Sequence, residues 1–357
     1  MNISISASGL AAALRSLEKV TPAKAVLPIL SHVLIDGSDG QATLSCTDTE
    51  LSLTRTLNAQ IEKVGRVALP AKPLLDIVSQ ITEPDVHIIV EKNAARIAAG
   101  QFKLRMQAMS ADEFPNIVTH ADKGVLLNGA TFRSLIRRVR PCISATEKRY
   151  NIAGALLVMS DKVTAVVTTD GKRLAISTQP AVGAVEQSII LPTRLIDTLI
   201  QDDAEDYSFS VSDNHIFFAS EQAILSSRML SEDKFPNYQR IIPQDNKNIV
   251  TIQRDLFLAA LKRVSLVANE GRGITYNVAG TVMTMQARSV ELGEATENLA
   301  VTYTGEPTQV TLHATAVTDF LEAARNPSIT IAIGGPNAAV LFNDGADFLT
   351  VAMSMRA

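Results

Sequence analysis

The chain has 357 residues, of which 46% are hydrophobic and 20% charged, and its formal net charge is −4. This length predicts two or three domains, and the composition is ordinary for a soluble globular protein. A negative net charge argues against indiscriminate nucleic-acid binding, and without a run of about 18 apolar residues we expect no transmembrane helix. The first residues alternate like a strand, which predicts no signal peptide. Cys46 and Cys142 are isolated, as expected of buried thiols in a cytosolic protein.

Each third of the chain is predicted to begin with a strand and an amphipathic helix. The apolar residues with helical spacing are Leu10, Leu14 and Leu17, then Phe132, Leu135, Ile136 and Val139, then Leu256, Ala260, Leu261 and Val264. Ser6 or Ser8 is a candidate N-cap for the first of these helices. Strand-like runs follow, a second helix is predicted after Pro70, Pro192 or His313, and more strands complete the unit. The order β-α-β-β-β-α-β-β-β, with small variations, predicts an α+β domain with two helices against antiparallel sheets.

The three units are repeats of one another. Phe114-Pro115-Asn116 returns as Phe235-Pro236-Asn237, and 236 − 115 is 121. Thr47-Asp48 returns as Thr169-Asp170, 122 residues later. A repeat of this length is long enough to be a whole domain with its own core. We therefore predict three tandem domains at residues 1–121, 122–246 and 247–357.

Positive charge gathers on the predicted helices. Residues 131–140 contain four arginines and no acid. The other helices also contribute basic residues, namely Arg15, Lys19, Lys24, Lys72, Arg194, Arg254, Lys262, Arg263, Arg272 and Arg325. Such segregation indicates a surface that attracts phosphates without reading base sequence. The alternative, ordinary solvated helix faces, stays open because Arg and Lys are good helix formers.

No catalytic signature is present. The sequence has no phosphate-binding glycine loop, nucleophile elbow or zinc-binding helix motif, and its five histidines are scattered singly. We therefore expect neither an enzyme nor a metal or other cofactor. An enzyme with an unrecognised site, acting on nucleotides, is the alternative.

Several short motifs, in order along the whole chain, give a resemblance to a known family. They are Leu27-Pro28-Ile29-Leu30, Glu113-Phe114-Pro115, residues 169–175, residues 234–238 and Met353-Ser354-Met355-Arg356. The chain resembles the bacterial sliding clamps, the beta subunit of DNA polymerase III. The resemblance implies a head-to-tail homodimer whose six domains form a closed ring, with helices lining the hole.

The function implied by the resemblance is that of a processivity factor, which encircles duplex DNA and tethers the replicative polymerase. Its implied partners are duplex DNA, DNA polymerase III and other polymerases, the clamp loader, and repair proteins that carry short apolar motifs. The implied location is the cytoplasm, at the nucleoid. A clamp-like adaptor that binds proteins without encircling DNA is the second alternative.

With the resemblance, three sets of residues are predicted; in the first, Lys24 and Arg149 are at positions where the family contacts DNA, and the others are basic residues expected to face the hole. The DNA-binding set is Lys24, Arg137, Arg140, Arg149 and Arg194. The partner-peptide pocket is Ile152, Thr169, Gly171, Lys172, Arg173, Leu174, Pro236, Arg240, Ile241, Val351, Met353, Ser354, Met355 and Arg356. The dimer interface is Phe102, Leu104 and Met106 against Leu266 and Val267 of the partner subunit. Ser354 and Ala357 depart from the proline and leucine usual in the family, so the pocket floor is expected to differ.

Overall fold

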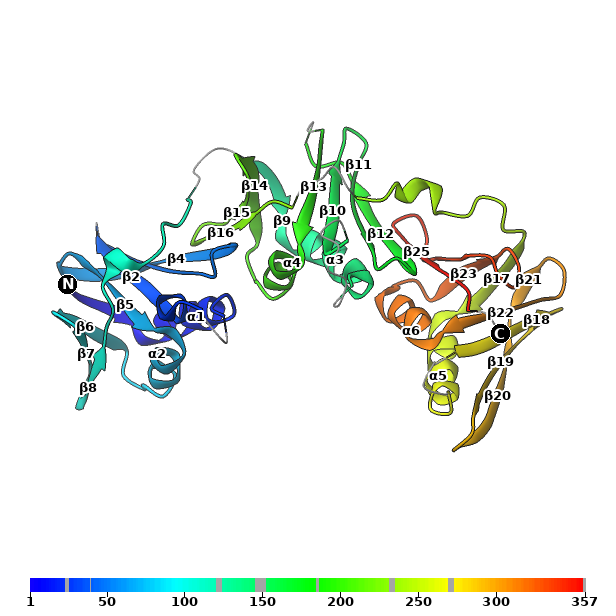
Figure 1. Ribbon diagram of the computed structural model, residues 1–357, viewed down its shortest axis with the longest axis horizontal. Coiled ribbons are helices and arrows are strands. Elements are labelled where there is room, and N and C mark those ends of the chain that lie inside the picture. The colour runs from blue at the N-terminus through cyan, green and yellow to red at the C-terminus, as the bar shows by residue number, and fades with distance from the viewer. Residues whose placement is uncertain are drawn as a thin grey trace. The chain divides into compact units, whose positions relative to one another are not determined.

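The structure is a computed structural model that describes residues 1–22, 26–38, 40–119, 124–144, 152–183, 186–230, 235–268 and 273–355. The chain divides into two compact units. Unit 1 contains Met1–Ala130 with Asp197–Met229, and unit 2 contains Thr131–Ile196 with Leu230–Ala357. The second repeat therefore contributes strands to both units (Figure 1).

In the described residues, each repeat has a strand, a helix, four or five strands, a second helix and three more strands. The first repeat has β1 Asn2–Ser6, α1 Ala7–Glu18, η1 Pro28–Ser31, β2 His32–Ser38, β3 Gln41–Thr47, β4 Leu51–Lys63, β5 Gly65–Pro70, α2 Ala71–Val78, β6 Asp85–Glu91, β7 Ala94–Ala99, β8 Phe102–Gln107 and η2 Ala111–Glu113. The second has β9 Val125–Asn128, α3 Gly129–Val139, η3 Arg140–Cys142, β10 Gly154–Met159, β11 Val163–Thr169, β12 Arg173–Pro180, β13 Gln187–Pro192, α4 Thr193–Ile200, β14 Asp206–Ser212, β15 His215–Ala219, β16 Ala223–Arg228 and η5 Tyr238–Arg240. The third has β17 Asn248–Gln253, α5 Arg254–Ser265, β18 Gly273–Ala279, β19 Val282–Ser289, β20 Gly293–Ala300, β21 Thr302–Thr304, β22 Thr308–His313, α6 Ala314–Ala323, β23 Ser328–Ile333, β24 Val340–Asn343 and β25 Phe348–Ala352.

The predicted helix starts are confirmed, whereas the predicted number of strands is wrong. Ser6 is the N-cap of α1 and accepts a hydrogen bond from the Gly9 amide at 3.4 Å. Among the described residues of the first repeat, four strands separate the two helices instead of three. Gly65 divides β4 from β5 with a φ of 156°, a conformation that glycine adopts without steric strain.

In unit 1, the sheet of the first repeat continues into strands of the second. The order is β8-β7-β6-β1-β4-β16-β15-β14-β9, with β2, β3 and β5 beside this path. The crossing point is the antiparallel pair β4–β16, where Leu53 lies opposite Leu225 and Arg55 opposite Ala223. Helices α1 and α2 pack on each other and bury Leu10, Leu14 and Leu74. We call the β4–β16 contact and its surroundings the first junction.

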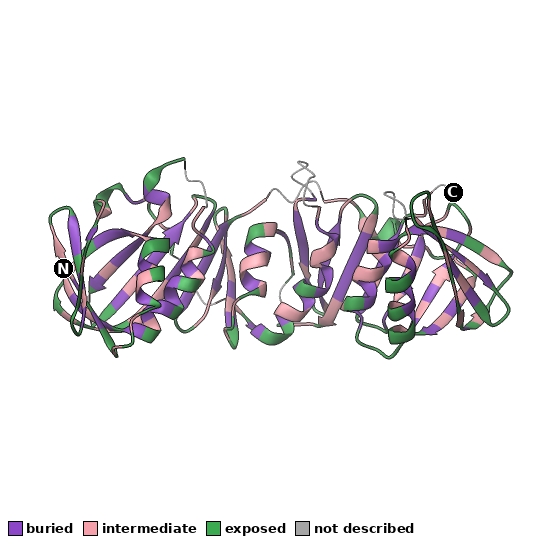
Figure 2. Ribbon diagram, turned by 90° about the horizontal axis from the view of Figure 1, so that it is seen from below, coloured by how far each residue is buried: buried purple, intermediate pink, exposed green. Residues whose placement is uncertain are grey.

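In unit 2, strands of the second and third repeats are joined in one sheet, as strands of the first and second repeats are in unit 1. Its longer sheet has the order β13-β10-β11-β12-β25-β24-β23-β17-β21, and a second sheet has the order β20-β19-β18-β22. In the second junction, β12 pairs with β25 and places Leu174 opposite Val351. Figure 2 shows buried residues along the strands behind the helices and exposed residues on the helix sides that face the viewer. The predicted α+β class, with helices against antiparallel sheets, is confirmed.

Equivalent hydrogen bonds confirm that the first two repeats share one fold. The Cys46 thiol donates to the Leu17 carbonyl at 3.1 Å, and the Thr168 hydroxyl donates to the Val139 carbonyl at 2.8 Å. Both members of the second pair follow those of the first by 122 residues, since 168 − 46 and 139 − 17 are both 122. A spacing of 122 therefore identifies equivalent positions in the two junctions.

Two expectations about the helices need correction. The four arginines of residues 131–140 do not form one solvated face, because Arg138 is buried. In α5, Leu256 is exposed and Phe257 occupies the core instead. The basic residues of α5 also have acidic partners, in the pairs Arg254–Asp255, Lys262–Glu322 and Arg263–Glu297. The third repeat therefore presents less net positive charge on this helix than its sequence predicts.

Candidate partner-binding pocket and nucleic-acid interface

A tight turn between β11 and β12 positions the residues of the second junction. The Asp170 carboxylate accepts hydrogen bonds from the amides of Lys172 and Arg173, both at 2.9 Å. The Thr169 hydroxyl donates to the Arg173 carbonyl at 2.8 Å and accepts from the Gly171 amide at 3.1 Å. Gly171 has a φ of 85°, so a side chain here would strain the turn. The Met353 amide then donates to the Lys172 carbonyl at 2.9 Å, which joins the turn to the end of β25.

Arg173 is fixed by acids from two repeats. Its guanidinium lies 2.8 Å from Asp170 and 2.5 Å from Asp319 of α6, and it donates to the Pro141 carbonyl at 2.6 Å. Burial lowers the pKa of Arg173, but the hydrogen bonds that Arg173 donates to Asp170 and Asp319, together with the negative charge of Asp170, raise it overall above its ordinary value. Arg173 thus stays charged, with its donors already engaged.

Nearby, burial raises the pKa of the Cys142 thiol to about 12. At physiological pH this thiol is protonated, and a protonated thiol is a poor nucleophile. Cys142 is therefore a structural residue of the junction.

A hollow of about 520 Å³ opens beside this turn. It is lined by Asp170, Lys172, Arg173, His313, Thr315, Ala316, Ala352, Met353, Ser354 and Met355. Met353 is half exposed, at 50%, and a flexible thioether side chain adapts to ligands of different shape. The hollow therefore combines an apolar methionine wall with a charged rim.

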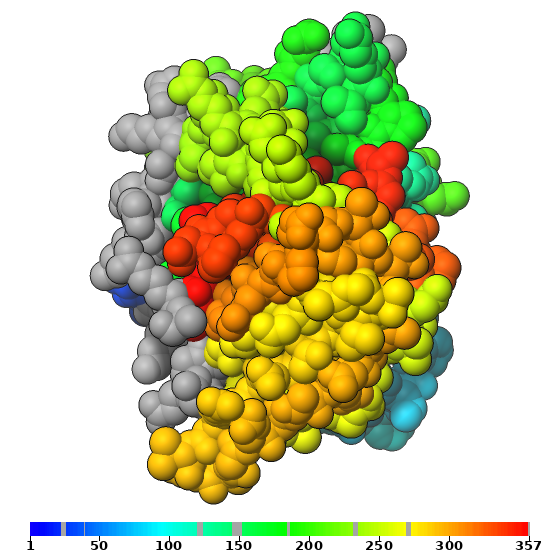
Figure 3. All heavy atoms as spheres, turned by 90° about the vertical axis from the view of Figure 1, so that its right-hand side faces the viewer, coloured from blue at the N-terminus to red at the C-terminus, as the bar shows by residue number. Residues whose placement is uncertain are grey.

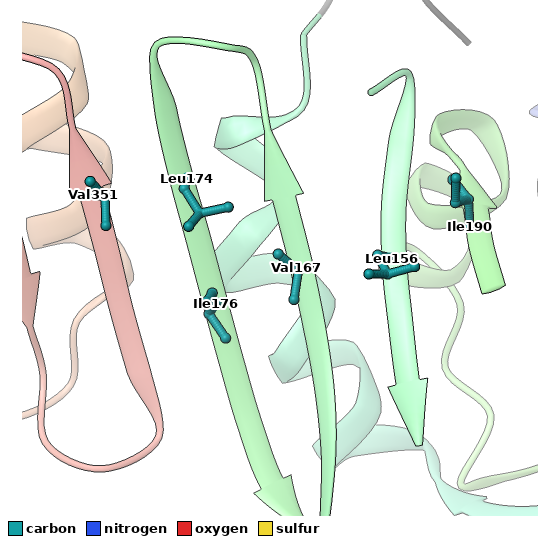
Figure 4. Close-up of a cluster of buried hydrophobic side chains, with 6 residues drawn as sticks. All are labelled: Leu156, Val167, Leu174, Ile176, Ile190 and Val351. Atoms are coloured by element: carbon teal, nitrogen blue, oxygen red, sulfur yellow. The ribbon is translucent and has the colours of Figure 1, made fainter. Parts of the chain in front are cut away.

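An apolar cluster on the sheet adjoins this wall. Figure 4 shows its six buried members, which come from β10, β11, β12, β13 and β25: Leu156, Val167, Leu174, Ile176, Ile190 and Val351. Phe235, Tyr238 and Ile242, from the segment that leads to the third repeat, pack against it. Because Leu174 and Val351 are opposite each other in β12 and β25, the cluster extends across the second junction.

The structure brings together some of the predicted pocket residues and separates others. Lys172, Arg173, Met353, Ser354 and Met355 line the hollow. Leu174 and Val351 lie in the cluster, and Thr169 and Gly171 form the turn. Ile152 is buried, and Pro236, Arg240 and Ile241 lie at η5, which contributes no residue to the hollow's lining. Arg356 lies outside the described residues.

The sequence reasoning missed the α6 side of the hollow. His313, Thr315 and Ala316 begin α6, 140 residues or more after Lys172 in the chain. The only sequence signal was a helix start at His313, and nothing in it indicates contact with the Asp170 turn. The pairing of β12 with β25 creates that contact.

The first junction has the same turn with different chemistry. Asp48 accepts from the amides of Glu50 and Leu51 at 2.9 and 2.7 Å, and the Arg228 amide donates to the Glu50 carbonyl at 2.9 Å. Arg228 therefore occupies the place that Met353 occupies in the second junction. Its side chain lies 3.5 Å from Glu50, as an exposed ion pair. A charged pair replaces the methionine wall, so this junction does not offer an equivalent apolar surface.

The predicted DNA-binding residues that are described lie on helices of the second repeat. Arg137 is exposed in the last turn of α3, Arg140 is half-buried in η3, and Arg194 is exposed in the first turn of α4. Arg137 also borders a hollow of about 370 Å³ with Ser134, Asp319, Glu322 and Arg325. Lys24 and Arg149 lie outside the described residues.

The predicted dimer residues lie at two sheet edges. In the described part of the chain, β8 ends the sheet of unit 1 and β20 ends the shorter sheet of unit 2. Phe102 is exposed on β8, Leu104 is half-buried and Met106 is buried. Leu266 and Val267 follow α5, and Leu266 is 75% exposed. Figure 3 shows the β19–β20 hairpin projecting from the third repeat.

Within the described residues, no His, Cys, Asp or Glu residues form a group of three or more suited to holding a metal ion. None of the helices described is long and apolar enough to cross a membrane.

Repeated α+β domains, basic residues on the helices of the second repeat and a hollow of about 520 Å³ beside the second junction are features of a protein of the sliding-clamp class. Family models of the DNA polymerase III beta subunit match at residues 1–118 (N-terminal domain), 126–237 (central domain) and 239–356 (C-terminal domain). The chain belongs to this family, the beta sliding clamps of bacteria.

Individual relatives agree over the whole length. The beta sliding clamp of Caulobacter vibrioides (strain NA1000 / CB15N) is 28% identical, with 97% of each chain covered. That of Vibrio cholerae is 26% identical, again over 97% of each chain. Among solved structures, the sliding clamp of Caulobacter crescentus has a TM-score of 0.94 at 27% identity, with each chain fully covered.

The two Asp turns allow a matched test of the local geometry. We expect Asp170→Ala to speed hydrogen exchange at the Lys172 and Arg173 amides about fivefold, because both lose an acceptor worth about 1 kcal/mol. Asp48→Ala should act in the same way on Glu50 and Leu51. Hydrogen-exchange mass spectrometry of both variants measures this. Unchanged exchange at Lys172 and Arg173 in Asp170→Ala would contradict the assigned turn.

Proposed function

We propose that this protein is a DNA sliding clamp that encircles duplex DNA and tethers the replicative polymerase as a processivity factor. The observation that carries the proposal is the match of all three repeats to the domains of the DNA polymerase III beta subunit. As a member of that family, the protein is a head-to-tail homodimer whose six domains form a ring, and it is not an enzyme. We place the domain limits at 1–121, 122–246 and 247–357, and the protein in the cytoplasm with the chromosomal DNA.

The mechanism is topological. A closed ring stays on the duplex without tight binding, so weak phosphate contacts suffice and permit sliding. Arg137, Arg140 and Arg194 supply such contacts from α3, η3 and α4, and we assign Lys24 and Arg149 to the same set. The net charge of the whole chain is −4, so surfaces outside this basic set are not expected to attract DNA phosphates.

The DNA contact is tested by charge reversal. We expect the double variant Arg137→Glu and Arg140→Glu to lose about tenfold in retention on circular plasmid after loading, because two phosphate contacts become repulsive. The measurement is gel filtration of the protein–plasmid complex, before and after the plasmid is linearised. The control is the double variant Lys162→Glu and Lys247→Glu, which replaces two exposed lysines. It changes the net charge by the same amount, and we expect it to stay on the circular plasmid like the wild type.

Three outcomes oppose the clamp. Retention that survives linearisation would mean binding without encirclement. Wild-type protein that binds partner proteins but never remains on circular plasmid would favour the non-encircling adaptor. Enzymatic turnover abolished by a single acidic or histidine substitution would favour the enzyme alternative.

We further propose that the hollow at the second junction is the site for short apolar motifs of polymerases, clamp loader and repair proteins. The methionine wall, the cluster of Figure 4 and the charged rim support this assignment. Griselimycin is a probe for such a site. It is bound to the clamps of Bartonella birtlesii and Pseudomonas aeruginosa in solved structures, and these clamps are 27% and 24% identical to this chain. Of the predicted residues, Lys172, Arg173, Met353, Ser354 and Met355 line the hollow, and we assign the remaining ones to its surroundings.

The comparison of junctions supplies the test. Met353→Arg places in the second junction the residue that stands in the first, and we expect it to weaken griselimycin binding by about tenfold or more through loss of buried apolar area. Isothermal titration calorimetry measures the affinity. The matched control, Arg228→Met, alters the first junction and should leave that affinity unchanged. Equal affinity in Met353→Arg and the wild type would rule out this wall as the contact surface.

The dimer interface is proposed at the β8 and β20 edges. An unpaired sheet edge is a template for pairing with another chain. On β8, the basic residues Lys103 and Arg105 alternate with Phe102, Leu104 and Met106, while β20 carries Glu294 and Glu297. Glu294 and Glu297 pair with Arg288 and Arg263 within the chain. We propose that Lys103 and Arg105 approach these glutamates when the two edges pair and close the ring, and exposed Leu266 also supports an interface here.

Reversal of the β8 charges tests this interface. We expect Lys103→Glu with Arg105→Glu to weaken the dimer about tenfold or more, since like charges then face each other across the paired strands. Light scattering coupled to gel filtration gives the mass across a dilution series. The Lys162→Glu, Lys247→Glu variant is the control here too. A variant that stays dimeric at every dilution would place the interface elsewhere.

A further inference from the structure

Arg138 is the one arginine of the 131–140 helix segment that the structure shows to be buried among those it describes, with 6% of its surface exposed. Its guanidinium lies 2.5 Å from Asp344 and 3.0 Å from Asp347. The same group stacks on the Phe348 ring at 4.2 Å and donates to the Ala323 carbonyl at 3.2 Å. A charge buried this deeply requires such partners, and each of them belongs to the third repeat.

Three of these partners lie at or just before the start of β25. Asp344 and Asp347 belong to the turn before β25, and Phe348 is its first residue. Asp344 also accepts hydrogen bonds from the amides of Arg325 and Asn326 at 2.8 and 2.9 Å. The turn is therefore attached to α3 on one side and to the end of α6 on the other. Four residues after Phe348, β25 ends at Ala352, and Met353–Met355 form the wall of the hollow.

The opposite wall is attached to η3, which directly follows α3. Pro141, three residues after Arg138, accepts a hydrogen bond from Arg173, and Arg173 lies on the rim with Lys172. Arg138 and Arg173, each with its acidic partners, lie on either side of a small space. This space, which Asp319 and Phe348 also line, is only about 10 Å³. The packing beneath the hollow is thus tight, and a displacement of β25 is transmitted to Met353.

We propose that Arg138 is a positioning residue of the partner pocket. It holds β25 against α3, so that Met353–Met355 lie at the correct separation from Lys172 and Arg173 before a partner arrives. Preorganisation of this kind increases affinity because less order has to be created on binding. The proposal rests on the proposed function of the hollow and assigns to Arg138 no contact with the ligand.

The first junction provides a matched comparison. The position equivalent to Arg138 is Ser16, and the position equivalent to Ser177 is Arg55, since both pairs differ by 122. Arg55 lies 2.7 Å from Asp202 and donates to the Ser16 hydroxyl at 3.2 Å. Arginine and serine have thus exchanged places between the helix and the strand. Both junctions contain a largely buried arginine–aspartate pair, but only in the second does the arginine contact the strand that leads into the pocket wall.

The experiment compares Arg138→Ser with Arg55→Ser in the full-length protein. Each substitution removes one largely buried arginine: Arg138→Ser takes the ion-pair partner from Asp344 and Asp347, and Arg55→Ser takes it from Asp202. Griselimycin is titrated into each variant by calorimetry. We expect about tenfold weaker binding for Arg138→Ser, as follows if about a tenth of the molecules keep a competent pocket, and no more than about twofold change for Arg55→Ser. Equal losses in both variants, or no loss in Arg138→Ser, overturn the proposal.

A second readout needs no ligand. The ¹³C-methyl NMR signals of Met353 and Met355 should shift or broaden in Arg138→Ser, while those of Met283 and Met285 on β19 stay in place. If Arg138→Ser does not fold, Arg138→Lys, which keeps the charge but not the planar contacts, is used with the same expectation. Wild-type protein that fails to bind griselimycin counts against the proposed pocket, and the methyl signals then decide the role of Arg138. Unchanged Met353 and Met355 signals overturn it.

Discussion

Strand pairing between successive repeats is the constraint on which the rest of the structure depends. The β4–β16 and β12–β25 pairs join strands from different repeats into continuous sheets. Backbone hydrogen bonds across these pairs satisfy edges that would otherwise be open to other chains. In the second junction, the pairing places the Met353 amide on the Lys172 carbonyl, although the two residues are far apart in the chain. The hollow exists because this register brings a turn and a chain end together.

Buried ion pairs specify how the helices meet these sheets. Removing a guanidinium from water is unfavourable unless acids and carbonyls replace the lost hydration. Arg55, Arg138 and Arg173 each have such partners, supplied in every case by more than one element. Apolar packing alone permits small shifts between a helix and a sheet, whereas a guanidinium that binds two carboxylates in fixed directions does not. These pairs therefore contribute geometry to the junctions more than they contribute net stability.

One scaffold yields two junctions of different character through a few substitutions. The Asp48 and Asp170 turns have the same hydrogen bonds, and each is followed by a backbone bond to the partner strand. In the first junction, Glu50 and Arg228 form an ion pair with each other, so the surface there is polar. Lys172 and Met353 leave the second with an adaptable apolar wall. A repeated domain can thus provide a structural joint and a binding site without a change of fold.

The sequence by itself determined the three repeats, the α+β class and the starts of the helices, and it showed that the Asp48 and Asp170 motifs correspond. Periodicity, caps and turn chemistry are local, so they are readable from neighbouring residues. It did not determine that Arg138 is buried, that Leu256 is exposed, or that His313 and Thr315 border the hollow. The α3 arginines are alike in sequence, and only the position of Asp344 and Phe348 distinguishes Arg138 from Arg137. Those positions follow from strand pairings between distant segments, which the tertiary structure alone decides, because burial and electrostatic partners depend on what folds against each face.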